Sequence, residues 1–449
     1  MSNPAGDESL ARIRARLLSL GQREPVAVPD LCHRIRDVVV LASSSRGGSS
    51  VVAEILRHSQ DMLHFRAEVN LFFALAERVF PGSGTGSDQL GADDLGDPST
   101  LGWLLARDVG RPAGGLPDDA AVETFGRELH WRLSAQWPLE SIAEEDVLRW
   151  TRQVLDDLTR DHGWSPGSFP DPQLFHTLLL RHARRAHPSI QPWYYDLRPD
   201  LIRAHHPGVE PSAAPPSSVV LEEPPFVTIT PWRQATEADL DLPLVIKTPS
   251  NAYRLPFLRA LFPAARIRVF HLTRNAAASI NGLHDGWLFR GFFAHRLPGR
   301  LSIDQYSDRY PQWGADWWKF DLPPGWEGWV DRPLVEVCGF QWRSAHEATL
   351  AYLESTRCDS LQLRFEDAVG IRDVRRDTFE RLTRWLGVPL RGELARLVDT
   401  GLPPIMATSR PRLRRWFDRA ELLEPVVQDP QTLALLERLG YALDPDTWT

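Results

Sequence analysis

The sequence contains few of the residues on which several classes of protein depend. Its three cysteines, Cys32, Cys338 and Cys358, are too few and too widely separated for a disulfide framework or a zinc site. No apolar run approaches the roughly 18 residues that a membrane-spanning helix needs. The formal net charge of −8 argues against a nucleic-acid-binding protein, which would present a basic surface. We therefore predict a protein without disulfides, membrane spans or a nucleic-acid partner.

The N-terminal residues also lack the features of an export signal. Residues 1–20 contain no continuous apolar core and no small-residue cleavage site. They predict a short amphipathic helix that begins near Asp7 or Ser9. We expect a cytoplasmic protein in which residues 1–36 form an N-terminal helical segment and residues 37–449 form one domain.

Beyond this segment, β-branched apolar runs alternate with stretches of helical periodicity. Such alternation predicts an α/β fold, a parallel sheet flanked by helices, with helical and loop insertions at about 81–240 and 284–335. Residues 81–120 and 206–243 are rich in glycine, aspartate or proline and predict long irregular loops. The expected strands span residues 37–42, 244–247, 266–273 and 361–365, and the expected helices span residues 49–58, 121–160, 172–186, 253–262, 275–283, 337–355, 373–386 and 430–440.

A run of serine, arginine and glycine joins the first strand to the first helix of this domain. Residues 38–50 read VVVLASSSRGGSS. A loop of this kind gathers backbone N–H groups at the positive end of a helix dipole, where a phosphate or sulfate binds well. A Walker A loop would place lysine after its last glycine, but Gly48 is followed by Ser49, and the cation is Arg46. Magnesium-dependent ATP chemistry is therefore disfavoured.

A second corner of the same kind follows the strand RIRVFHLT at residues 266–273. Arg274 and Asn275 come directly after that strand and open another helix. The carboxyl ends of parallel strands meet at one edge of a sheet, and ligands bind there. The sequence thus predicts two anion-binding corners in one architecture.

With these two corners in this order, the sequence resembles the sulfotransferases that use 3′-phosphoadenosine 5′-phosphosulfate (PAPS). The resemblance extends over roughly residues 36–440 and includes LRFEDAV at 363–369 and the basic loop SRPRLRRW at 409–416. It implies a P-loop NTPase-like fold, PAPS as co-substrate and no metal. By resemblance, the residues that bind the 5′-phosphosulfate are Ser45, Arg46, Gly47, Gly48, Ser49 and Ser50.

The 3′-phosphate of the donor is expected to bind at the second corner. The resemblance assigns it to Arg274 and to a serine, but the family's usual serine position is Gly282 here. Ser279 lies one helical turn earlier and is our first candidate, with Asn281 as the alternative. Ser409, Arg410 and Arg412 of the basic loop would close over the same phosphate, and Trp416 would either stack on adenine or pack in the core.

Sulfuryl transfer requires cations near the leaving group and a base near the acceptor. Arg46 and Lys247 are the expected cations, and Lys247 is one of only two lysines in the chain. One branch of the family carries a histidine base two residues after this lysine, where this sequence has Pro249. We therefore predict Glu68 as the general base, by resemblance to a glutamate in other branches, with His284 as the rival.

The stretch 284–343 is unusually rich in aromatic residues and lies where the family binds its acceptor. It suggests a bulky apolar or aromatic small-molecule acceptor. O- or N-sulfation, a homo-oligomer and a carrier-bound acceptor all stay open. A P-loop kinase using ATP and magnesium and a non-catalytic nucleotide-binding module are the two alternative functions.

Overall fold

The computed structural model describes residues 4–23, 26–401 and 404–448. Its central sheet has four parallel strands in the order β4-β1-β5-β8. This confirms the expected α/β class with a parallel sheet flanked by helices. The strands are β1 (Asp37–Ala42), β4 (Leu244–Lys247), β5 (Arg266–Thr273) and β8 (Asp359–Arg364).

The first strand shows why these residues form the centre of the sheet. Val38 and Val40 pack into the apolar cluster on one face, and Val39 and Leu41 pack into the cluster on the other. A strand that is buried on both faces needs a continuous apolar run rather than an alternating one. The register aligns Val38 with Leu244 of β4 and Ile267 of β5, so the three strands end at the same edge.

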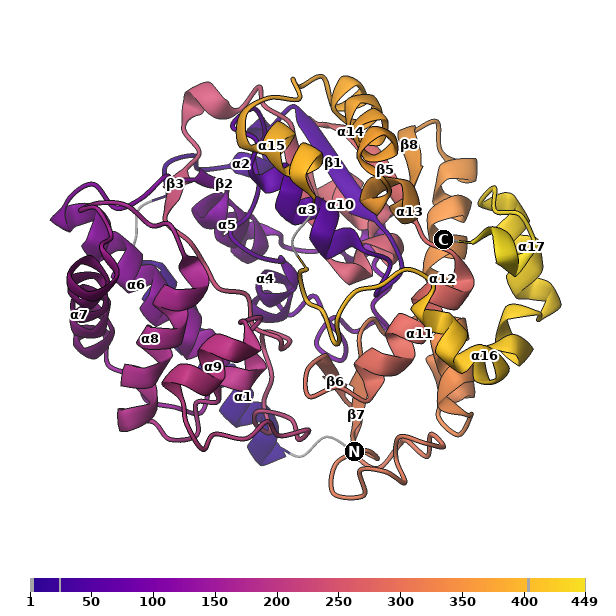
Figure 1. The fold of residues 1–449 in the computed structure, drawn as a ribbon, viewed down its shortest axis with the longest axis horizontal. Helices are drawn as coiled ribbons and strands as arrows, with labels where there is room; N and C mark the ends of the chain where they lie inside the picture. The colour runs from indigo at the N-terminus through magenta and orange to yellow at the C-terminus, as the bar shows by residue number, and fades with distance from the viewer. Residues whose placement is uncertain (1–3, 24–25, 402–403, 449) are drawn as a thin grey trace.

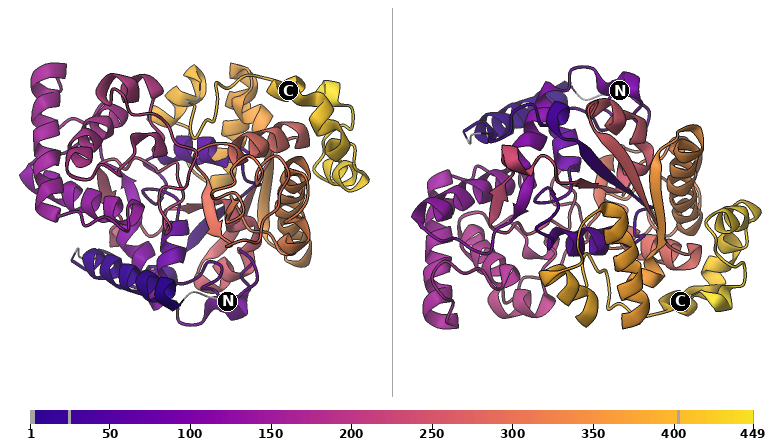
Figure 2. Two further views of the ribbon diagram at one scale, coloured as in Figure 1. Left: turned by 90° about the horizontal axis from the view of Figure 1, so that it is seen from below. Right: turned by 90° about the horizontal axis from the view of Figure 1, so that it is seen from above.

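Helices cover both faces of this sheet (Figure 2). One face packs against α3 (Ser49–Arg57), α14 (Arg372–Leu386) and α15 (Gly392–Thr400). On the other face lie α1 (Pro4–Gly21), α2 (Leu31–Arg34), α4 (Asn70–Leu75), α5 (Ser99–Asp108) and α10 (Leu255–Leu261), and two residues of α12 (Leu334–Ser355) pack among them. The helix α1 begins earlier than Asp7 or Ser9, so its predicted start is wrong.

The expected long loop at 81–120 contains regular structure. Residues 99–108 form α5, and β2 (Gly110–Pro112) pairs antiparallel with β3 (Trp232–Gln234) from the second proline-rich stretch. The flanking glycines and prolines concealed the apolar positions Leu101, Leu104 and Leu105, which bury one face of α5. The prediction of a structureless loop is therefore wrong.

Four helices with their own apolar cluster form the lobe on the left of Figure 1. Helical periodicity at 121–160 and 172–186 predicted most of this lobe, although a break at 137–143 divides the first stretch in two. Nothing in the structure tests the proposed division at residue 36, which stays a prediction. The helices are α6 (Asp119–Gln136), α7 (Glu144–His162), α8 (Pro172–Ala186) and α9 (Pro199–His205).

Most of the aromatic stretch is core rather than pocket. Trp287, Trp318, Trp326 and Trp342 are fully buried in one cluster. Lys319 is also buried there, and its Nζ donates to the Gly291 carbonyl at 2.9 Å, so this lysine has a structural role. The elements of this part are α11 (Ala276–Trp287), β6 (Phe293–Arg296), β7 (Trp317–Lys319), α12, α16 (Ala420–Val427) and α17 (Pro430–Arg438), with α13 (Phe365–Val369) after β8.

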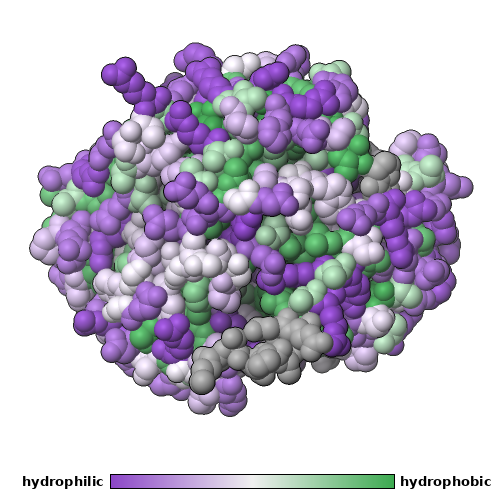
Figure 3. All heavy atoms as spheres, turned by 180° about the vertical axis from the view of Figure 1, so that it is seen from behind, coloured by the Kyte–Doolittle hydropathy of each residue, from purple (hydrophilic) through white to green (hydrophobic). Residues whose placement is uncertain are grey.

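The surface opposite to the view of Figure 1 is mixed, with hydrophobic residues scattered among hydrophilic ones (Figure 3). Among the described residues, we find no helix that is both long enough and apolar enough to cross a bilayer. Single turns of 3-10 helix occur at Ala92–Leu95, Pro192–Tyr194, Glu237–Asp239, Pro249–Tyr253, Trp326–Trp329, Arg415–Arg419 and Pro445–Thr447.

Candidate functional site

A cavity of about 680 Å³ lies at the carboxyl ends of β1, β4 and β5. It brings together the loop after β1, the end of β4 and the start of α11. The predicted site residues that line it are Ser45, Arg46, Gly48, Ser49, Ser50, Glu68, Lys247, Arg274, Asn281, Ser409, Arg410 and Arg412, and Trp416 lines it as well.

The loop after β1 has the geometry of an anion-binding turn. Gly48 is the N-cap residue of α3, with a φ of 94°, and provides no side-chain hydrogen bond to the first turn. The N–H groups of Ser49 and Ser50 therefore remain available to a ligand, whereas that of Val51 already donates to the Gly48 carbonyl at 3.1 Å. Ser45 is fixed from below, because its Oγ donates to buried Asp321, which also accepts from Tyr253 at 2.9 Å.

Gly48 admits no side chain. A Cβ there would lie 2.1 Å from Cδ2 of Phe365, and the positive φ adds strain. We expect Gly48→Ala to lower stability by on the order of 1–3 kcal/mol, measured by urea unfolding, and to weaken nucleotide binding. Gly84→Ala is the matched control, because Gly84 also has a positive φ of 74° but no atom within 4 Å of its Cβ position. Equal losses in the two variants would contradict the steric argument.

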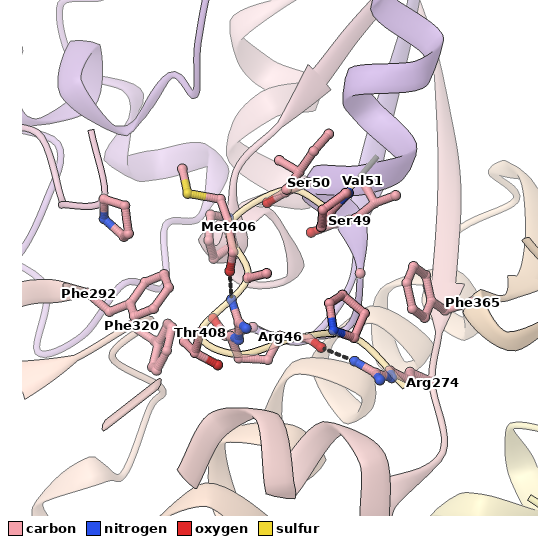
Figure 4. A pocket seen from close by; sticks show the side chains of 18 of the residues that line it. Arg46, Ser49, Ser50, Val51, Arg274, Phe292, Phe320, Phe365, Met406 and Thr408 are labelled. Carbon is pink, nitrogen blue, oxygen red and sulfur yellow. Dashed lines mark hydrogen bonds between the residues drawn. The ribbon is translucent and has the colours of Figure 1, made fainter. Parts of the chain in front are cut away.

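The two anion-binding corners are joined by a direct hydrogen bond. Nη1 of Arg274 donates to the carbonyl of Arg46 at 3.0 Å, and both side chains line the cavity (Figure 4). The Arg274 guanidinium also lies over the Phe365 ring, 4.9 Å from its centroid. Burial, with the charges of Arg274 and Arg415, lowers the pKa of Arg46 to about 10, so Arg46 stays charged at neutral pH. This part of the cavity therefore favours an anionic ligand.

The lysine and the glutamate predicted from sequence form an ion pair. Lys247 Nζ contacts Glu68 Oε1 and donates to Ser50 Oγ at 2.9 Å. Backbone pairing brings them together, because Val245 donates to the carbonyl of Leu63 at 2.9 Å and the segment before Glu68 thus lies beside β4. The result is a cation and a carboxylate beside Ser50, where the loop joins α3.

A strap formed by residues 404–416 passes over the cavity and carries the predicted basic loop. Met406 ties it down: its N–H donates to Asp196 Oδ2 at 3.0 Å, and its carbonyl accepts from Arg46 Nη1 at 2.8 Å. The predicted residues Ser409, Arg410 and Arg412 line the cavity from this strap but remain exposed to solvent.

Three predicted site residues do not line the cavity. Gly47 belongs to the loop but does not face the cavity, and a Cβ at this position would be 2.3 Å from Ser43 Oγ. On α11, Ala278 and Asn281 face the cavity, whereas Ser279 is rotated about 100° from Ala278 and its Oγ is buried. The structure thus favours Asn281, whose Oδ1 accepts from Arg419 at 2.8 Å.

His284 is the third of these residues. It is buried on α11 outside the cavity lining, and burial lowers its pKa below the usual value of 6.5. As the rival base, it is therefore poorly placed to reach an acceptor in the cavity.

Two acidic cavity residues were missed by the sequence analysis, and two aromatic ones come from the stretch 284–343 that it proposed for the acceptor. Glu222 and Glu223 line the cavity from the second proline-rich stretch, and Glu222 forms an ion pair with Arg132 Nε at 2.6 Å. Phe292 and Phe320 stack with their ring centroids 4.5 Å apart and border Arg46 on the side away from Arg274 (Figure 4). Two adjacent glutamates within an otherwise apolar and proline-rich stretch were the signal available for the first pair.

No family model and no curated protein match this chain. The solved structures that are similar to it include two sulfotransferase domains. The sulfotransferase domain from the curacin biosynthetic pathway is 11% identical with a TM-score of 0.38, covering 92% of this chain and 100% of that domain. The sulfotransferase domain from the Synechococcus PCC 7002 olefin synthase is 15% identical with a TM-score of 0.33, covering 92% and 97%. Both are described as sulfotransferase domains, and at these identities and TM-scores the likeness assigns no activity to this chain.

Proposed function

We propose that this protein is a sulfotransferase that moves a sulfuryl group from PAPS to a hydroxyl group of a bulky acceptor. One observation carries the proposal: both anion-binding corners and the Lys247–Glu68 pair open into the same cavity. A donor with a phosphate on each side of its ribose could contact both corners at once. The acceptor would then meet the sulfate beside the only lysine that lines the cavity among the described residues.

The residues present fit such a donor. The first turn of α3 and Arg46 would hold the phosphosulfate, while Arg274 and the arginines of the strap would hold the 3′-phosphate. The donor supplies an activated sulfuryl group, whose departure leaves negative charge on the bridging phosphate oxygen. Arg46 and Lys247 can stabilise that charge, because both are cations close to the loop.

Glu68 is the proposed base. It lies at the cavity wall, its side chain is 27% exposed, and Lys247 holds its carboxylate in place. A base must come within hydrogen-bond reach of the acceptor hydroxyl to take its proton during transfer. Phe292 and Phe320, on the side of Arg46 away from Arg274, offer an apolar wall to the acceptor (Figure 4).

The donor site can be tested through Arg274. We expect Arg274→Ala to weaken binding of 3′-phosphoadenosine 5′-phosphate by roughly 10- to 100-fold, since a hydrogen-bonded charge contributes about 1.5–3 kcal/mol. Calorimetry measures this directly, with Arg357→Ala as the control, because Arg357 is an exposed arginine outside the cavity lining. Unchanged affinity in Arg274→Ala would contradict the assignment of the 3′-phosphate.

The function itself is tested by incubation with radiolabelled PAPS and a broad set of alcohols and phenols. Sulfated products, identified by a mass gain of one SO₃ unit, support the proposal. The two alternatives give different results. A kinase would bind ATP with magnesium more tightly than the bisphosphate, and a binding module would bind the bisphosphate but transfer nothing.

A further inference from the structure

Among the described residues, four acidic side chains line the cavity: Glu68, Glu222, Glu223 and Glu366. Three of them have partners. Glu68 pairs with Lys247, Glu222 pairs with Arg132, and Glu366 accepts from the Asn275 backbone at 2.9 Å and from Tyr441 at 3.0 Å. These three carboxylates are therefore accounted for by the protein's own structure.

Glu223 differs from the other three. Its Oε1 is shielded from solvent, yet no hydrogen-bond partner for that atom exists in the described part of the chain. A buried polar atom without a partner costs about 1–3 kcal/mol, and such atoms often mark a place for a ligand. Its neighbour Pro224 is fixed, because the Pro224 carbonyl accepts from the backbone N–H of Phe292, one of the two aromatic residues at the cavity wall.

The charges around Glu223 are predominantly negative. Burial has the largest effect and, together with the nearby carboxylates of Glu68, Asp321 and Asp88, raises the pKa of Glu223 to about 8; Lys247 acts in the opposite direction. The charge of Glu223 also interacts with that of the buried Lys319. A cation bound beside Glu223 would offset the surrounding negative charge and stabilise the ionised form of this carboxyl group.

We propose that Glu223 binds a positively charged nitrogen of the acceptor. The acceptor would thus be an alcohol that also carries an amine or a guanidine group, with its apolar part against Phe292 and Phe320. This inference rests on the proposed sulfotransferase function, because it assigns the acceptor to the same cavity. The cavity would then use different groups for its two substrates: Arg46 and Arg274 for the donor, and for the acceptor the carboxyl of Glu223, whose neighbour Pro224 is hydrogen-bonded to Phe292.

Two alcohols that differ in one group serve as probes. The enzyme is saturated with 3′-phosphoadenosine 5′-phosphate and titrated in a calorimeter with para-(aminomethyl)benzyl alcohol or with para-methylbenzyl alcohol. We expect the amine to bind at least about tenfold more tightly, because a desolvated charge pair is specific for its partner. In Glu223→Gln this preference should fall below about twofold, and Glu223→Asp, which keeps the charge, should retain part of it.

Proton release provides a second measurement. At pH 7 a carboxyl with a pKa of about 8 is mostly protonated, and a bound cation favours its ionised form. Binding of the amine should therefore release close to one proton, which appears as a dependence of the enthalpy on the ionisation enthalpy of the buffer. This release should be absent in Glu223→Gln and present in Glu347→Gln, since Glu347 is exposed on α12 outside the cavity lining.

The outcomes separate the two proposals. Equal affinity for the two alcohols, no binding of the amine, or a preference that survives in Glu223→Gln would each overturn the role of Glu223. The titrations with the two alcohols are repeated without nucleotide, and binding of the bisphosphate is measured separately. Failure of the bisphosphate to bind would contradict the sulfotransferase proposal alone. The amine measurement would still decide the role of Glu223 in that case.

Discussion

Glu68→Gln is expected to lower kcat by roughly 10²- to 10⁴-fold, because the amide cannot accept the proton of the acceptor hydroxyl. The substitution keeps the size of the side chain and its contact with Lys247. The first turn of α3 and Arg274 are unchanged, so affinity for 3′-phosphoadenosine 5′-phosphate should stay within about twofold of the original value. Initial rates with radiolabelled donor and calorimetry with the bisphosphate measure the two quantities.

Glu347→Gln is the matched control for this experiment, since it makes the same chemical change at an exposed position outside the cavity. It should leave both rate and affinity unaltered. Normal turnover by Glu68→Gln would exclude this residue as the base. A loss of nucleotide affinity as large as the loss of rate would instead indicate that Glu68 positions the loop through Lys247.

Lys247→Met is expected to reduce kcat by roughly 10²- to 10³-fold, the effect typical of removing one group that stabilises transition-state charge. Methionine keeps an unbranched side chain but removes the cation that lies between Ser50 Oγ, at 2.9 Å, and Glu68. The same rate assay measures the loss.

The double variant Glu68→Gln with Lys247→Met distinguishes a shared role from two separate roles. If the ion pair acts as a unit, the double variant should be little slower than the slower single variant, because effects of residues that act together are not additive. Multiplied losses would show that the two residues act at independent steps. A Lys247→Met enzyme with normal kcat would contradict the role of Lys247 in the reaction.

Three strands of the sheet could be predicted with their bounds because they are largely buried on both faces, whereas the edge strand β8 is partly exposed and begins two residues earlier than predicted. The strands at 37–42, 244–247 and 266–273 were placed with the bounds that the structure has, since a continuous β-branched run has few other stable conformations. The helix α5 could not be placed, because its apolar face packs against the main core through contacts that its glycine- and proline-rich flanks do not reveal.

The residues proposed to bind the donor were more predictable than those proposed to bind the acceptor. The loop after β1 and Arg274 lie next to their strands in sequence, so local pattern was sufficient to predict that they line one cavity. Helical phase determines that Asn281 rather than Ser279 lines the cavity, and this depends on how α11 is rotated against its neighbours. The adjacent glutamates marked the position of Glu223 but not its surroundings, because the charged groups that act on it are 24 to 155 residues away in sequence and meet it only through the tertiary fold.

The hydrogen bond from Arg274 to the Arg46 carbonyl sets a fixed spacing between the two corners. If the cavity binds the proposed donor, this spacing would select nucleotides by where their charges lie, as well as by how many they carry. A triphosphate concentrates its charge at one end and can satisfy only one corner, whereas a nucleotide phosphorylated on both sides of its ribose can satisfy both. Adenosine bisphosphates with the second phosphate at the 2′ rather than the 3′ position would differ in this spacing alone, and the protein should distinguish them.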